Sequence, residues 1–176
     1  MFTAFAGGPP LAAQTYTVIH SFTGTTDGSA PAAGLTRGPK DTLIGTTQYG
    51  GTFGEGTVFA INREGKVHLT YSFCQLANCA DGAVPFGSVT LDDSGNIYGT
   101  TSTADIFLYG AVFKIDPKGN ETVLHTFEGP ASGDGANPGG TLLRDAEDNL
   151  YGTTEGGGLF CLLDLNGYLD KDFKKQ

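Results

Sequence analysis

Short apolar segments alternate with turn sequences along most of the chain. In the segment that starts at Thr57, the residues Thr57, Phe59 and Ile61 alternate with the residues between them, which is the period of two typical of a strand. The segments are separated by turn sequences in which Asp or Asn comes first and Gly last: NREG, DDSG and DPKG. This pattern predicts short antiparallel strands joined by connections of hairpin length.

The pattern repeats three times. Ile44, Tyr98 and Tyr151, each followed by Gly-Thr-Thr, lie 54 and 53 residues apart. The same spacing relates three Asp-Gly pairs, each followed by a proline: Asp27-Gly28 with Pro31, Asp81-Gly82 with Pro85, and Asp134-Gly135 with Pro138. It also relates the segments GTVFAINREG, GAVFKIDPKG and GLFCLLDLNG, and the segments TVIHSF, HLTYSF and TVLHTF. Each repeat therefore holds four short strands.

Four strands in a repeat of this length predict an all-β fold of β-propeller-like blades. One four-stranded sheet cannot cover both of its own faces, so it has to stack on neighbouring sheets. We expect the innermost strand to hold Leu35, Val89 and Leu142, followed by the Gly-Thr-Thr strand and the GTVF strand, with TVIHSF outermost. A β-sandwich is the alternative, although it does not require so regular a repeat.

The sequence resembles the GloVer tandem repeat of exported bacterial choice-of-anchor proteins. The resemblance rests on the recurring P-x-x-G-L, N-L-Y-G-T-T, G-x-V-F-K-I-D-x-x-G and T-V-L-H-S-F segments. It covers residues 15–167, as three propeller-like repeats, and implies a surface or secreted protein without implying an activity. Residues 17–22 precede any complete blade, so we expect them to close the last blade as its outer strand. Residues 168–176 form a C-terminal tail.

Charge and composition narrow the possible partners. The formal net charge is -9 with only 10 Lys and Arg, which argues against nucleic acid, because phosphate binding needs clustered basic residues. No apolar run approaches the roughly 18 residues that a membrane-spanning helix needs. Residues 1–14 end in small residues, as a signal-peptide remnant does, with a disordered arm as the alternative. We expect an extracellular or cell-surface location in a bacterium, with the periplasm as the alternative.

The cysteines predict one disulfide. Cys74 and Cys79 stand in an insertion, CQLANC, and in an exported protein they are expected to form a local disulfide, with two free thiols as the alternative. Cys161 replaces Phe59 and Phe113 of the other repeats and is expected to be a buried thiol.

No catalytic motif is present in the sequence. His20, Tyr71 and His125 occupy equivalent places, and a side chain that repeats from blade to blade is expected to be structural rather than catalytic. The glycine-rich YGGTFGEG segment lacks the helix that a phosphate-binding loop requires after it.

The remaining site candidates are polar residues at the ends of strands. In a propeller, the loops that carry the three Asp-Gly pairs and those that begin at the last Thr of each Gly-Thr-Thr emerge on one face. We therefore predict a ligand site built from six residues: Asp27, Asp81, Asp134, Thr47, Thr101 and Thr154. Its expected ligand is a carbohydrate or a cation; no cofactor is predicted, and calcium is the ion that such oxygen ligands suit. The alternative is that each Asp only starts a turn.

The sequence thus predicts an exported, non-catalytic binding or scaffold protein. A propeller enzyme acting on polysaccharide and a purely structural surface array are the alternatives. Propellers close with roughly four to eight blades, so three repeats predict a homodimer that completes a six-bladed ring, or a piece of a longer array.

Overall fold

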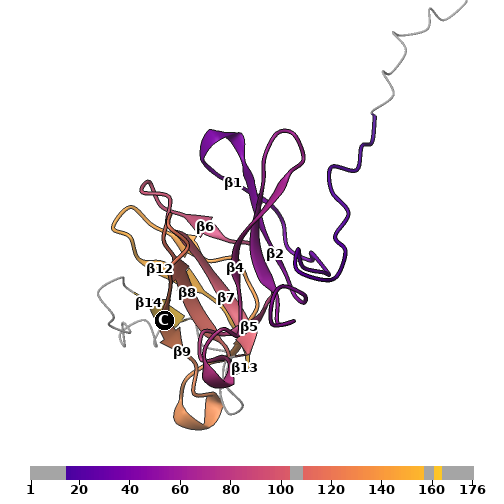
Figure 1. The fold of residues 1–176 in the computed structure, drawn as a ribbon. Helices are drawn as coiled ribbons and strands as arrows, with labels where there is room; N and C mark the ends of the chain where they lie inside the picture. The colour runs from indigo at the N-terminus through magenta and orange to yellow at the C-terminus, as the bar shows by residue number, and fades with distance from the viewer. Residues whose placement is uncertain (1–14, 104–108, 157–160, 164–176) are drawn as a thin grey trace, which may run out of the picture.

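The fold is all-β, as the periodicity predicts. The computed structural model describes residues 15–103, 109–156 and 161–163; the predicted arm 1–14 and tail 168–176 lie outside these ranges. Three blades follow one another in chain order, from β1 and β2 through β7 and β8 to β12 and β14 (Figure 1). No helix in these ranges is long and apolar enough to cross a bilayer.

The first blade has the predicted strand order, from the inner strand to the outer one. Its antiparallel sheet runs β1-β2-β3-β4, with β1 at Thr36–Arg37, β2 at Leu43–Thr47, β3 at Thr57–Ile61 and β4 at Val67–Ser72. A short 3-10 helix, η1 (Pro39–Asp41), joins the first two strands. The Gly-Thr-Thr strand pairs with the GTVF strand, with Gly45 opposite Phe59.

The second blade repeats this order and adds one short strand. The strands are β5 (Ala83–Pro85), β6 (Thr90–Leu91), β7 (Ile97–Thr103), β8 (Ala111–Ile115) and β9 (Glu121–Thr126). Both β5 and β6 pair with β7, and β8 and β9 follow outward. In both blades the register shifts at the same place, between Val58 and Phe59 and between Val112 and Phe113. The shift is a β-bulge, which increases strand twist.

The third blade is shorter in the described ranges. Its strands are β10 (Ala136–Pro138), β11 (Leu143–Arg144), β12 (Leu150–Gly152), β13 (Thr154–Gly156) and β14 (Cys161–Leu163). The sheet runs β11-β12-β14, and β10 pairs separately with β13. Two 3-10 turns, η2 (Ala77–Cys79) and η3 (Pro130–Ser132), lie in the connections between blades.

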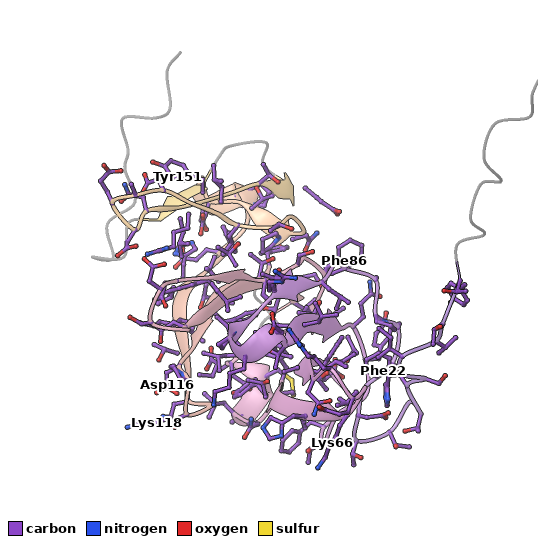
Figure 2. All side chains as sticks on the ribbon, turned by 90° about the horizontal axis from the view of Figure 1, so that it is seen from above. Phe22, Lys66, Phe86, Asp116, Lys118 and Tyr151 are labelled. Carbon is purple, nitrogen blue, oxygen red and sulfur yellow. A yellow bond between two sulfur atoms is a disulfide. The ribbon has the colours of Figure 1, made fainter. Side chains whose placement is uncertain are left out.

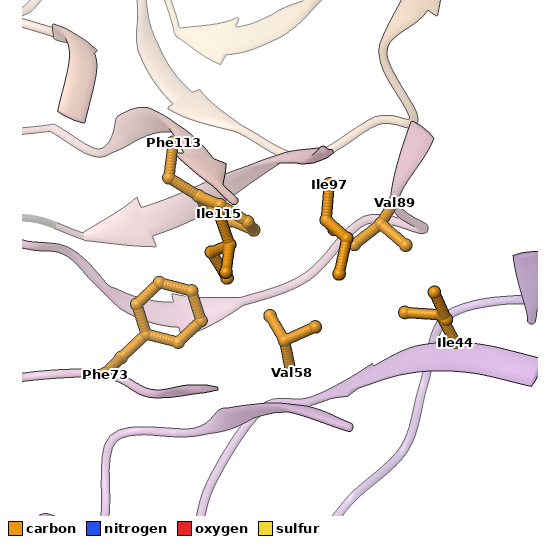
Figure 3. Packing of buried hydrophobic residues seen from close by; sticks show 7 residues of the cluster. All are labelled: Ile44, Val58, Phe73, Val89, Ile97, Phe113 and Ile115. Carbon is orange, nitrogen blue, oxygen red and sulfur yellow. The ribbon is translucent and has the colours of Figure 1, made fainter. Parts of the chain in front are cut away.

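The core lies between the blades rather than within them. One cluster joins the first two blades and contains Ile44, Val58, Phe73, Val89, Ile97, Phe113 and Ile115 (Figure 3). A second cluster joins the second and third blades and contains Tyr98, Val112, Phe127, Leu142 and Leu150. These five residues are the equivalents, one repeat later, of the first five in the first cluster. The sequence repeat therefore produces stacked blades, because each sheet buries one face on the next.

Residues 17–22 differ from the expectation, because they form no strand. They lie beside the first blade, whereas β14 lies at the far side of the molecule (Figure 1). A strand needs a hydrogen-bonding neighbour, and the last blade of the same chain is out of reach. Closure of a last blade by these residues stays a prediction.

Candidate functional site

The three predicted aspartates lie in the connections that follow the outer-strand positions. Each carboxylate contacts a ring side chain of the preceding segment, at the position that repeats from blade to blade. The contacts are His20 Nε2 to Asp27 at 3.1 Å, Tyr71 Oη to Asp81 at 2.9 Å, and His125 Nε2 to Asp134 at 3.0 Å. The repeated ring residues therefore hold the loops.

Backbone amides of the same loops also donate to these carboxylates. Asp81, which is fully buried, accepts hydrogen bonds from the amides of Gln75 and Leu76 at 2.9 and 3.1 Å. Asp27 accepts one from the amide of Thr23, and a hydrogen bond from the Thr23 hydroxyl lowers the pKa of Asp27. Each aspartate thus closes the connection to the next blade.

The three predicted threonines pack against the glycines that follow these aspartates. A Cβ atom on Gly28 would lie 2.3 Å from Thr47 Oγ1, and one on Gly82 would lie 2.4 Å from Thr101 Oγ1. Both glycines have positive φ, at 99° and 91°, which favours glycine. Gly135 and Thr154 make the same approach. The structure therefore brings each predicted Asp-Gly pair to its threonine, once per blade.

The hydroxyls of these threonines have unequal partners. Thr47 Oγ1 lies 2.8 Å from Thr57 Oγ1, and Thr154 donates to the carbonyl of Gly156 at 3.1 Å. Thr101 Oγ1 is buried and has no hydrogen-bond partner within the described ranges. Within those ranges no group of three His, Cys, Asp or Glu side chains is close enough to hold a metal ion. A ligand that joins the six residues stays a prediction.

A cleft of about 680 Å³ lies between the first and second blades. It is lined by the hairpin turns between β1 and β2, between β6 and β7, and between β8 and β9. These turns lie at the opposite ends of the strands from the Asp-Gly loops, since the strands are antiparallel. Asp116 and Lys118, from the β8–β9 turn, mark the rim of this cleft in Figure 2.

The cleft is open because the first blade has small side chains where the second has large ones. Ile44 and Ala60 line it. At the equivalent positions of the second blade, Tyr98 is buried and Lys114 Nζ lies 5.7 Å from the centroid of its ring.

The turns at the cleft are fixed by their own aspartates. Asp92 accepts hydrogen bonds from the amides of Ser94 and Asn96, from the Asn96 side chain and from the hydroxyl of Tyr98. Burial acts to raise the pKa of Asp92, but the hydrogen bonds, those from Asn96 first, lower it overall. Asp116 is held by Lys118 and Asn120 in the same way. The carboxylates of Asp92 and Asp116 hold their own turns in place. The exposed side chain of Asp93 also lines the cleft.

The side chain of Glu121 lies between the first two blades, in surroundings that disfavour its charged form. Burial, and next the charge of Asp81, raise the pKa of Glu121 to about 7. Its Oε1 atom is buried and has no hydrogen-bond partner in the described part of the chain. Burial, and next a hydrogen bond to Asp81, also raise the pKa of Tyr71. Glu121 therefore titrates near neutral pH.

The sequence-based interpretation missed the cleft and Glu121. An alignment of the repeats contains a signal for the cleft. The first repeat has Ile44 where the other two have tyrosine, and it has Ala60 where the second has Lys114. Which side of a blade these positions face is set by stacking. Nothing in the sequence marked Glu121 as unusual, since charged residues are common at the ends of outer strands.

The chain belongs to the Gloeobacter/Verrucomicrobia repeat family, whose model matches residues 9–162. The recognition of this repeat from its sequence is therefore confirmed. A comparison with curated proteins finds no match.

Similar solved structures are β-propellers. Virginiamycin B lyase from Staphylococcus aureus has 18% identity and a TM-score of 0.56, over 80% of this chain and 40% of that one. A gluconolactonase from Xanthomonas campestris has 14% identity and a TM-score of 0.42, over 77% of this chain and 59% of that one. The chain thus spans less than two thirds of each of these proteins, and at this identity the first likeness shows the fold alone. The TM-score of the second is too low to support an inference about this chain.

Proposed function

We propose that this protein is a non-catalytic binding protein that takes an uncharged polar ligand, of the carbohydrate class, in the cleft between its first two blades. The observation that supports this is the size and lining of the cleft. Its volume of about 680 Å³ falls within the range of small-molecule sites, and it combines an apolar wall of Ile44, Ala60 and Leu91 with polar groups at the rim.

The charges around the cleft favour an uncharged ligand. Arg37 and Lys118 line it together with three carboxylates, those of Asp92, Asp93 and Asp116. The acidic groups disfavour an anion, and the basic groups disfavour a divalent cation. A ligand rich in hydroxyl groups can donate to the carboxylates and accept from Arg37 and Lys118.

Two observations support an exported protein. Cys74 and Cys79 form the predicted disulfide, and disulfides persist mainly in oxidising compartments. The repeat also resembles the GloVer tandem repeat of exported bacterial proteins. These observations support the proposal that the protein works at the bacterial cell surface or in the extracellular space, with the periplasm as the alternative.

The other functions have weaker support. A calcium ion at the Asp-Gly loops would have to displace the hydrogen bonds that hold Asp27, Asp81 and Asp134. A polysaccharide-acting enzyme has one observation in its favour, the raised pKa of Glu121, because catalytic acids are often tuned in this way. A purely structural array predicts no ligand at all.

The decisive experiment fills the cleft. The double variant Ile44→Tyr/Ala60→Lys copies the side chains that Tyr98 and Lys114 place in the second blade. Oligosaccharides found by glycan-array screening are then titrated by calorimetry, and we expect binding at least about tenfold weaker in the variant, because filled volume excludes the ligand. Leu76→Lys adds the same charge on an exposed loop and should leave binding unchanged.

Three results would overturn this proposal. The first is unchanged affinity in the cleft-filled variant. The second is loss of affinity in Asp27→Asn alone, which would move the site to the Asp-Gly loops. The third is turnover of a polysaccharide that Glu121→Gln abolishes, which would favour the enzyme.

A further inference from the structure

Two faces at the ends of the row of blades have no neighbouring blade in the described part of the chain. The front face is the side of the first blade that bears Leu35, Leu43 and Phe59. The rear face is the side of the third blade that bears Tyr151 and Thr153. Tyr151 and Phe22, which lies on the front face, are at opposite ends of the molecule (Figure 2).

The two positions equivalent to Leu35 are buried by the preceding blade. Val89 is 1% exposed and Leu142 is 5% exposed, each in one of the two core clusters. Leu35, at the equivalent position, is 51% exposed. A large apolar side chain in this pattern indicates a surface meant for another blade.

The rear face carries a threonine whose equivalents in the first two blades form hydrogen bonds to the next blade. Thr46 and Thr100 are buried and donate to carbonyls of the next blade, those of Gly87 and Gly140. Thr153, at the equivalent position, is exposed. A following blade would bring a carbonyl acceptor to this position, as Gly87 and Gly140 do at the two interfaces within the chain.

The residue types of the two faces match an interface that the chain already contains. Between the second and third blades, Tyr98 clusters with Leu142 and Leu150. The equivalent residues of the rear and front faces are Tyr151, Leu35 and Leu43, again one tyrosine and two leucines. The front face therefore fits the rear face of this same chain.

The N-terminal segment already lies where the outer strand of a preceding blade would end. Phe22 packs on Phe59 with ring centroids 4.9 Å apart at 62°. Phe73, from the outer strand of the first blade, packs on Phe113 of the second with centroids 5.0 Å apart at the same angle. The contact of His20 with Asp27 also reproduces that of His125 with Asp134. Phe22 and His20 thus make the contacts of an outer-strand end, although residues 17–22 form no strand and no blade precedes them in the described part of the chain.

The N-terminal segment and the outer edge of the third blade complement each other. Residues Tyr16, Val18 and Ile19 precede the anchored part and are exposed and unpaired as strands. In the described ranges the sheet of the third blade ends at β14, whereas the first two blades have a fourth strand there.

We propose that two copies of this chain join head to tail, each docking its rear face on the front face of the other. Residues 17–22 of each copy then add the fourth strand to the partner's third blade, beside β14. The ring has six blades, within the range of roughly four to eight in which propellers close. This inference is independent of the ligand proposed for the cleft.

The first test is the mass in solution. Light scattering coupled to size exclusion should give about twice the chain mass of 18.3 kDa at roughly 10 μM protein. A compact monomer at about 100 μM, or an open series of three and more chains, would overturn the proposal. The open series is what a fragment of a longer array would give.

The second test uses one variant on each face. Leu35→Asp and Tyr151→Asp should each weaken dimerisation at least about tenfold, because a buried unpaired charge is costly, while Leu76→Asp on an exposed loop should not. An equimolar mixture of the two variants should regain a dimer, since one of its two contacts then joins two native faces. Failure of the mixture to associate would contradict a head-to-tail contact.

The third test addresses the added strand. In the dimer, the amides of residues 17–19 should exchange hydrogen at least about tenfold more slowly than in Tyr151→Asp. The double variant Thr17→Pro/Val18→Pro removes two donors and should weaken the dimer while leaving monomer circular dichroism unchanged. Fast exchange of these amides in a wild-type dimer would show that another segment completes the third blade.

Discussion

The two interfaces between blades use the same positions for their cores but differ at the end where the hairpin turns lie. Between the first and second blades, this end is lined by Ile44, Ala60 and Leu91, and a cleft remains. The equivalent residues between the second and third blades are Tyr98, Lys114 and Arg144. Here the tyrosine is buried and the lysine lies over its ring.

This comparison separates two roles of the repeat. The shared apolar positions hold the sheets together, since they are buried at both interfaces. The variable positions at the turn end decide whether space remains for a ligand. Burial, and next a hydrogen bond to Asp92, raise the pKa of Tyr98 to about 12.

The largest expected effect comes from removing a shared core ring. Phe73 is fully buried between the first two blades. Phe73→Ala should lower the free energy of unfolding by about 3–5 kcal/mol, because it leaves a cavity, as measured by urea denaturation. Phe127→Ala, its equivalent at the second interface, should cost as much. Phe86→Ala, at a half-exposed ring, serves as the control and should cost less than about 1 kcal/mol. Equal small effects at all three positions would mean that the interfaces do not hold the fold.

A smaller effect is expected from making the second interface resemble the first. Tyr98→Ile should lower the free energy of unfolding by about 2–3 kcal/mol, because it removes ring volume and the hydrogen bond to Asp92. Tyr98→Phe removes only that hydrogen bond and should cost about 1 kcal/mol. If the two variants lose the same amount in chemical denaturation, the ring volume is not what closes this interface.

The connections between blades also differ, because only the first contains a disulfide in the described ranges. Cys74→Ser/Cys79→Ser should lower the free energy of unfolding by about 2 kcal/mol on the loop-entropy estimate. The melting temperature of the variant should match that of the wild type under reducing conditions. A variant as stable as the oxidised wild type would show that the short loop is already ordered without its bond.

The smallest effect depends on pH and concerns the first interface. The pKa of Glu121 is raised from 4.5 to about 7 in the folded protein, so between these values the native state binds more protons than the unfolded state. Stability from this group is therefore complete below pH 4.5 and falls as the pH rises to about 7.

Glu121→Gln should remove this dependence. Because the side chain is partly in contact with solvent, we expect the variant to be more stable than the wild type by only about 1–2 kcal/mol at pH 8. At pH 4 the two should be equal. Glu64→Gln, at an exposed position, should show no such difference. A wild-type advantage at pH 8 would indicate that the Glu121 carboxylate has a partner that stabilises its charged form.

Much of the fold could be predicted because the repeat carries it three times. The strand order, the pairing of Gly-Thr-Thr with GTVF, and the disulfide were all expected and are present, although the inner strands begin one residue after Leu35, Val89 and Leu142. A strand at residues 17–22 was expected from the same logic and is absent, because pairing depends on a neighbour that the sequence pattern does not supply.

The candidate site shows where prediction from the sequence ended. Each predicted Thr packs against the glycine that follows its predicted Asp, and each Asp holds a loop, while a shared ligand stays a prediction. What the carboxylates do in a folded loop depends on donors such as the Tyr71 hydroxyl and the Leu76 amide, whose directions are fixed only by folding. The cleft depends on which residues of two separate repeats meet.

The sequence by itself determined the repeat, the strand order and the apolar positions, because local periodicity and turn residues act within a few neighbours along the chain. Only the tertiary structure decided that Ile44 and Ala60 line a cleft while Lys114 lies over the buried Tyr98 ring, that Glu121 is half-buried within the field of Asp81, and that Phe22 rests on Phe59. The physical reason is that volume and desolvation are properties of surfaces that meet, and these surfaces come from residues roughly one repeat apart.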